Sequence, residues 1–194
     1  TTFSLLSSRG CPYRCIYCNS HNINGRKFRA RSPQNLVREI ELLIRQFRAM
    51  QFEFVDDTFT IDRARVIKFC RLLKERAINI KWACNARVDT VDIGLLKEMK
   101  NAGCTTIMYG IESCFQENLD VLKKGTKVEQ SEKAISWAKE AGLTTHCYFL
   151  TGIPGEGYDK VKQSVGKLSK LEIDFPSVAI LTPFPGTELY SIAA

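Results

Sequence analysis

The 194-residue sequence has no run of eighteen apolar residues, and its first thirty residues carry polar and charged groups. A membrane-spanning helix needs about 20 mostly apolar residues, and a signal peptide needs a shorter apolar stretch near its start. Neither membrane insertion nor export is indicated, so we expect a cytoplasmic protein without a membrane segment. The composition, 44% hydrophobic and 25% charged, predicts one globular domain over residues 1–194.

The sequence also lacks the cysteine pattern of a disulfide-rich secreted domain. Five of its eight cysteines are scattered singly among apolar residues, which predicts reduced, packed thiols: Cys70, Cys84, Cys104, Cys114 and Cys147. The other three, Cys11, Cys15 and Cys18, lie together in "SRGCPYRCIYCN" at spacings of four and three, with no fourth cysteine nearby.

Acidic and basic residues are unequal in number, with 28 Lys and Arg against 21 Asp and Glu and a net charge of +7. The tightest basic cluster comprises Arg26, Lys27, Arg29 and Arg31, and only Phe28 is interleaved with it. Surfaces that bind single-stranded nucleic acid combine cations with stacking aromatics. We therefore interpret the cluster as a solvated basic face and expect no nucleic-acid partner.

Apolar and β-branched runs alternate with helical patterns along the chain. The runs predict six strands, at residues 3–6, 52–55, 78–83, 105–109, 144–150 and 178–181. Ser32 as N-cap and Pro33 in the first turn open the first long helix. Strands that alternate with helices indicate parallel βα units, and six units fall short of the eight in a closed barrel. We predict an α/β fold, a partial (β/α)6 TIM-like barrel with parallel strands and functional groups at their C-terminal ends.

The cysteine triplet follows the first predicted strand, at the end where function is expected. A structural zinc site normally takes four protein ligands, so a zinc-binding module would need His21 beside Cys11, Cys15 and Cys18. A four-iron cluster held by three thiolates leaves one iron open to a further ligand. A non-catalytic iron–sulfur carrier would instead require a fourth cysteine.

The spacing C-x3-C-x2-C, with Tyr17 before the last cysteine, resembles the signature of the radical S-adenosylmethionine (SAM) superfamily. The stretches "FEFVDDTFT", "IKWACNARVD", "TTIMYGIES", "YFLTGIPGE" and "TPFPGTELY" follow in order and resemble the branch often fused to a cobalamin-binding domain. The resemblance extends over nearly the whole chain, which looks like a core excised from a longer protein.

The resemblance implies an enzyme in which Cys11, Cys15 and Cys18 ligate a [4Fe–4S] cluster and SAM chelates the fourth iron. An electron from the cluster would cleave SAM to a 5′-deoxyadenosyl radical, for hydrogen abstraction from a small-molecule substrate or for methyl transfer. It further implies an electron donor of the flavodoxin or ferredoxin type and cobalamin bound by a domain absent from this chain. A methylthiotransferase acting on RNA is the alternative within the superfamily.

The resemblance also implies the side chains that bind SAM, and it adds no catalytic residue beyond the cluster and cofactor site. Asp57, in preference to Asp56, would accept from the methionine ammonium group, the alternative being a helix cap. Arg87 would meet a carboxylate or be solvated. Glu112 would face the cofactor or pair with Arg87.

Two further stretches are implied to lie against the adenine. Gly152 and Gly155 would let the ring approach the backbone, with Ile153 as an apolar face, although a simple turn also explains the glycines. The stretch around Pro183, and the carbonyl of Tyr17, would reach the adenine edge through the backbone.

Overall fold

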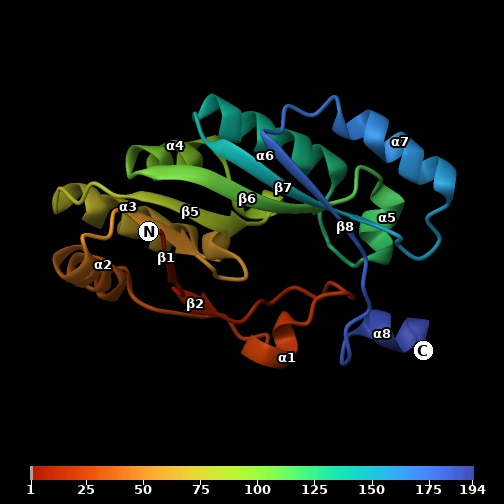
Figure 1. Cartoon of the computed structure of the whole chain (residues 1–194), viewed down its shortest axis with the longest axis horizontal. Coiled ribbons are helices and arrows are strands. Elements are labelled where there is room, and N and C mark those ends of the chain that lie inside the picture. The colour runs from red at the N-terminus through yellow and green to blue at the C-terminus, as the bar shows by residue number, and fades with distance from the viewer. Residues whose placement is uncertain (1) are drawn as a thin grey trace.

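The structure, a computed structural model, describes residues 2–194, and its centre is one six-stranded sheet (Figure 1). The strands are β1 (Thr2–Leu5), β4 (Gln51–Phe54), β5 (Lys81–Ala86), β6 (Cys104–Glu112), β7 (Thr144–Thr151) and β8 (Phe175–Ile180). They lie in the order β1-β4-β5-β6-β7-β8, and every neighbouring pair is parallel. Because β1 and β8 form the two edges, the sheet is open, and the predicted α/β fold with a partial barrel is confirmed.

Long helices follow the strands and cover one face of the sheet (Figure 1). They are α2 (Pro33–Phe47), α3 (Arg63–Glu75), α4 (Ile93–Asn101), α6 (Val128–Glu140) and α7 (Tyr158–Leu168). Shorter elements are α1 (Ser20–Asn24), α5 (Gln116–Val121), α8 (Glu188–Ala193), the 3-10 turns Phe59–Ile61 and Val88–Thr90, and a hairpin of β2 (Ser8–Arg9) with β3 (Arg29–Ala30). No helix among residues 2–194 combines the length and apolarity needed to cross a membrane.

Capping residues fix where the helices begin. The Ser32 side chain accepts from the backbone N–H of Asn35, and Pro33 opens α2, as predicted. Asp62 caps α3 by accepting from the N–H of Arg65. The alternative that Asp57 caps the helix after β4 is therefore wrong.

Large aromatic side chains fill the space between the sheet and helix α3. Phe54, Phe59, Phe69 and Trp82 are at most 1% exposed, and their ring centroids lie 4.6 to 6.0 Å apart. The indole N–H of Trp82 donates to the carbonyl of Ala102 at 2.8 Å, so this buried donor is satisfied. This packing fixes β4 and β5, whose C-terminal ends carry residues of the candidate site.

Three predicted strand boundaries need correction. β5 begins three residues later than predicted, because Ile78 is part of a turn in which its N–H donates to the carbonyl of Leu73. β6 continues to Glu112, and β8 begins at Phe175. The hairpin of β2 and β3 was missed because two-residue strands leave no periodic pattern.

The five scattered cysteines are free thiols, as predicted. Burial raises the pKa of Cys70 and of Cys147 to about 12, so both stay protonated. They pack as small apolar side chains.

Candidate functional site

The three clustered cysteines lie on a loop of residues 11–18, which we call the cysteine loop, between β2 and α1. Backbone hydrogen bonds hold it at both ends, from Cys11 to Gly25 (3.2 Å) and from Ile16 to Leu122 (3.1 Å). Gly10 has φ +88°, and a Cβ there would collide with the carbonyl oxygen of Lys27. Only glycine therefore fits at the entry to the loop.

All three thiols of the cysteine loop are half-buried. Burial raises the pKa of Cys11 and of Cys18, and the charges of the neighbouring cysteines raise both further. Thiols that disfavour one another's ionisation suit a cationic partner, and an iron–sulfur cluster takes its ligands as thiolates. The donor set of this loop therefore fits a [4Fe–4S] cluster.

His21, the fourth ligand of the zinc alternative, uses its ring differently. Its Nδ1 lies 3.0 Å from the carbonyl oxygen of Cys18. Among residues 2–194, no group of three or more His, Cys, Asp or Glu side chains lies close enough to hold a single metal ion. This finding applies equally to Cys11, Cys15 and Cys18, so it does not separate a zinc site from an iron–sulfur cluster.

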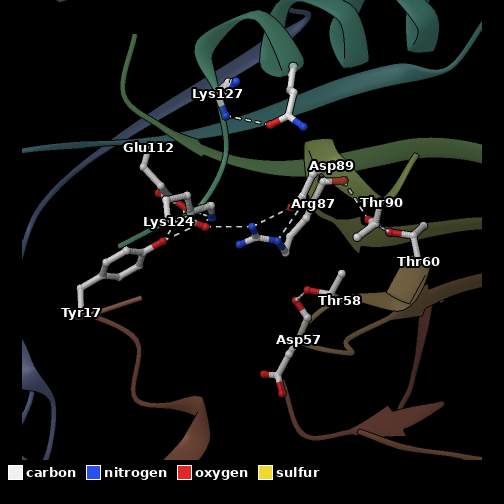
Figure 2. Close-up of polar contacts among 11 residues, drawn as sticks. Tyr17, Asp57, Thr58, Thr60, Arg87, Asp89, Thr90, Glu112, Lys124 and Lys127 are labelled. Atoms are coloured by element: carbon white, nitrogen blue, oxygen red, sulfur yellow. Dashed lines mark hydrogen bonds and ion pairs between the residues drawn. The ribbon is translucent and has the colours of Figure 1, made fainter. Parts of the chain in front are cut away.

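A buried ion pair joins the cysteine loop to the end of β6 (Figure 2). The Nζ of Lys124 lies 2.7 Å from Oε1 of Glu112, and the Tyr17 hydroxyl donates to the same oxygen at 2.8 Å. The side chains of Lys124 and Glu112 are 7% and 8% exposed. Burial, followed by the charge of Glu112, raises the pKa of Tyr17 well above its usual value, so the hydroxyl stays a donor.

The backbone at the end of β6 is shaped to make this ion pair. Glu112 has φ +70°, which is uncommon for a residue with a Cβ, and it follows a break in the register of β6 with β7. A Cβ on Gly110 would come within 2.6 Å of Oε1 of Glu112 and 2.9 Å of Nζ of Lys124. Gly110 therefore leaves the space in which the two charges meet.

Arg87, just beyond β5, ties together two parts of the site and is only 5% exposed. Its guanidinium makes two 3.0 Å contacts with Asp89 and donates to the carbonyl of Lys124 at 2.8 Å. Its central carbon lies 3.5 Å from the ring centroid of Tyr13, in the cysteine loop. The predicted alternatives of a solvated Arg87 and of an Arg87 pair with Glu112 are both wrong (Figure 2).

Adjacent aspartates at the end of β4 have opposite environments. Asp56 is fully buried and accepts from the backbone N–H of Ser7 (2.6 Å) and from the hydroxyls of Ser7 and Ser8 (both 2.5 Å). Asp57 is exposed, with Oδ2 3.4 Å from the amide nitrogen of Asn24. Asp57 is near enough to the thiols to add to the rise that burial causes in the pKa of Cys11 and Cys18.

A small apolar cluster anchors the cysteine loop through Ile16. We call it the rim cluster, and it consists of Ile16, Leu122, Ile153, Leu181 and Leu189. Ile153 is 2% exposed within it. Gly152 and Gly155 are exposed and have positive φ angles, and Pro183 is half-buried in the loop after β8. The predicted adenine contacts of these residues stay predictions.

Sequence reasoning missed three residues that build the site. Lys124 stands beside Lys123 in "LKKGT", where nothing marks which lysine is buried. Tyr13 stands between two cysteines, and no local pattern pairs it with the distant Arg87. Glu156 in "GIPGE" accepts from the N–H groups of Gly152 (2.8 Å) and Ile153 (3.3 Å). A carboxylate that follows two glycines so closely was the sequence signal that could have predicted this turn.

Comparison with known proteins gives one family match. The model of the radical SAM superfamily matches residues 5–168. The superfamily and the cobalamin-associated branch expected from the motifs agree with the relatives described next, and the family implies a [4Fe–4S] cluster and SAM.

Two curated relatives match almost the entire chain. It is 34% identical to an uncharacterised methyltransferase of Pyrococcus horikoshii, over 97% of this chain and 41% of that protein. It is 31% identical to the anaerobic magnesium-protoporphyrin IX monomethyl ester cyclase of Rubrivivax gelatinosus, over 94% of this chain and 33% of that protein. The chain thus spans less than half the length of either relative.

A solved structure shares the fold. The radical SAM methyltransferase TsrM of Kitasatospora setae, with cobalamin and a [4Fe–4S] cluster bound, superposes with a TM-score of 0.89 at 24% identity. The match covers 97% of this chain and 36% of TsrM.

Proposed function

This chain belongs to the radical SAM superfamily, and from that premise we propose that it binds a [4Fe–4S] cluster through Cys11, Cys15 and Cys18 and cleaves SAM reductively. The complete protein would then act on a small-molecule substrate by methyl transfer or hydrogen abstraction. The names of the two relatives, an uncharacterised methyltransferase and an anaerobic magnesium-protoporphyrin IX monomethyl ester cyclase, support this reaction class. The bound cobalamin of TsrM supports cobalamin as a further cofactor of the complete protein.

The observation that carries the proposal is how firmly the cysteine loop is held at the sheet's functional end. Its backbone bonds to Leu122, its Tyr17 hydroxyl bonds to Glu112, and its Tyr13 ring lies against Arg87. Metal ligands need such support, because positioning from neighbouring groups fixes their orientation. A loop that served only as a connection would have no need of a buried ion pair beneath it.

The cluster, when bound, supplies a one-electron reductant and an open iron. The chain's own residues would position SAM: Asp57 is an exposed acceptor beside the thiols, suited to an ammonium group. Glu112 and Lys124 present both charge signs next to Tyr17. Asp56 has both oxygens occupied by serines and would hold β1 and β4 together.

The test is anaerobic reconstitution with iron and sulfide, followed by electron paramagnetic resonance of the reduced protein with and without SAM. We expect about four irons per chain, a signal that shifts when SAM is added, and release of 5′-deoxyadenosine. Cys15→Ala should lose the iron while the unloaded fold persists, and Cys114→Ala, a substitution of a buried cysteine outside the loop, should keep it. Unchanged iron content in Cys15→Ala would refute the ligand assignment.

A further inference from the structure

The positive charge of this protein is concentrated in one segment. Residues 9–31 contain six Lys or Arg and no Asp or Glu, whereas the entire chain has a net charge of +7. The other residues are therefore nearly neutral in sum. Five of the six cations are exposed, and we call them the basic turn: Arg9, Arg14, Arg26, Lys27 and Arg29.

The cations of the basic turn are not neutralised by neighbouring carboxylates. Arg31, the sixth cation of the segment, pairs with Glu39 at 2.5 Å. None of the five exposed cations forms an ion pair with any of residues 2–194. A carboxylate that contacts this segment is that of Asp57, whose Oδ2 accepts a hydrogen bond from the side-chain amide of Asn24 at 3.4 Å. An uncompensated patch of one sign creates a field that steers an oppositely charged partner.

The basic turn is built directly onto the cysteine loop. A guanidinium nitrogen of Arg26 donates to the carbonyl of Tyr13 at 2.8 Å, between the first two cysteines. The Arg29 guanidinium holds the turn by donating to the carbonyls of Lys27 (3.0 Å) and Asn24 (2.8 Å). Figure 1 shows β2 and α1 along the lower edge of the molecule, apart from the layer of α4 and α6, and the five cations of this segment are exposed.

We propose that the basic turn is the docking surface for a small acidic protein that delivers one low-potential electron to the cysteine loop. The proposal rests on the proposed function, because the reductive cleavage of SAM consumes one electron. In the delivery step the carrier is oxidised by one electron and the cluster is reduced by one, and no bond forms or breaks. Opposite charges raise the rate of such encounters, and redox partners form small, transient interfaces.

Nucleic acid is less well matched to the same charges. Binding of single strands relies on exposed aromatic rings on which bases stack. Phe28 is half-buried, and Tyr13 is half-buried with the Arg87 guanidinium over its ring at 3.5 Å. The cations of this face therefore lack a stacking platform.

The experiment reverses two charges that hold no other contact. The side chains of Arg9 and Lys27 make no hydrogen bond or ion pair within residues 2–194, so Arg9→Glu combined with Lys27→Glu changes the surface and spares the turn. Lys68→Glu with Arg71→Glu, two exposed cations on α3, is the control with the same change in net charge. The probe is a purified acidic flavodoxin, used reduced in stopped-flow reduction of the reconstituted protein.

We expect the Arg9/Lys27 variant to be reduced by flavodoxin about 10-fold more slowly at low ionic strength, within the range that electrostatic steering spans. The difference should shrink as salt is added. Reduction by dithionite, and all rates of the control variant, should stay at the wild-type level. Equal flavodoxin rates for the wild type and the Arg9/Lys27 variant would overturn the proposal.

A second readout needs no cluster. Binding of fluorescently labelled flavodoxin to the unloaded protein should weaken in the Arg9/Lys27 variant and not in the control. If reconstitution fails but this difference persists, the proposed function fails and the docking surface stands. If a labelled single-stranded RNA binds through Arg9 and Lys27 while flavodoxin binding is insensitive to them, the surface is a nucleic-acid site and the proposal is refuted.

Discussion

The buried pair of Lys124 and Glu112 can be tested by removing its two charges separately and together. Replacing one partner leaves the other charge buried and unpaired, which destabilises proteins by about 3–5 kcal/mol, whereas replacing both is often nearly neutral. With side-chain exposures of 7% and 8% and a separation of 2.7 Å, little solvent is available to screen this pair. We therefore expect Lys124→Met to cost about 3 kcal/mol.

For a protein of this size, a loss of that magnitude lowers the melting temperature by about 6–12 °C. The double variant Glu112→Gln with Lys124→Met should lie within about 1 kcal/mol of the wild type. The strain of the positive φ at Glu112 is present in all four proteins of the cycle and cancels.

The measurement is urea unfolding of the unloaded wild type, both single variants and the double variant. With each single variant costing about 3 kcal/mol and the double variant at most about 1 kcal/mol, the coupling free energy between the two positions should be about 5 kcal/mol. If the effects of the single variants simply add, the two charges do not depend on each other in solution and the reasoning is refuted.

Three further outcomes are expected. Asp57→Ala should weaken SAM binding, measured by calorimetry on the reconstituted protein, without loss of iron; unchanged affinity would remove Asp57 from the site. Gly110→Ala should lower the free energy of unfolding by about 1–3 kcal/mol through overpacking, whereas Gly166→Ala, in a helix with open space, should raise it by about 1 kcal/mol; equal effects would contradict the close contact. Hydrogen bonds from the N–H and hydroxyl of Thr145 lower the pKa of Asp174 below its unfolded value, so its stabilisation is present above about pH 4 and lost as the pH falls further. The melting-temperature difference between the wild type and Asp174→Asn should therefore shrink in acid, and a constant difference would argue against the shift.

The sequence was most informative where a pattern is local. Apolar and β-branched runs predicted six strands, and their alternation with helical patterns predicted that the strands are parallel. The spacing of Cys11, Cys15 and Cys18 predicted their grouping, since a loop of eight residues cannot separate them far. The start of α2 after Ser32 was predicted from the chemistry of the N-cap residue alone.

The sequence was least informative where partners come from distant segments. Arg87 and Glu112 end neighbouring strands, so their pairing was a reasonable hypothesis, but the return of the chain after α5 brings Lys124 to Glu112 instead. Nothing local distinguishes Lys124 from Lys123, whose charge points outward to Glu188. Asp56 is buried and Asp57 is exposed, and the difference depends on hydrogen bonds from the segment after β1 to Asp56.

The rim cluster joins the cysteine loop to residues that are synthesised much later, Leu181 and Leu189 among them. The cysteine loop is synthesised before two segments that contact it: the N–H of Leu189 bonds to the carbonyl of Ile16, and the N–H of Ile16 bonds to the carbonyl of Leu122. A nascent chain that has not reached Leu189 therefore carries the three thiols on a loop that still lacks this backbone bond. Because domains fold during translation from the N-terminal side, the cysteine loop gains its contact with Leu189 only after that residue has emerged.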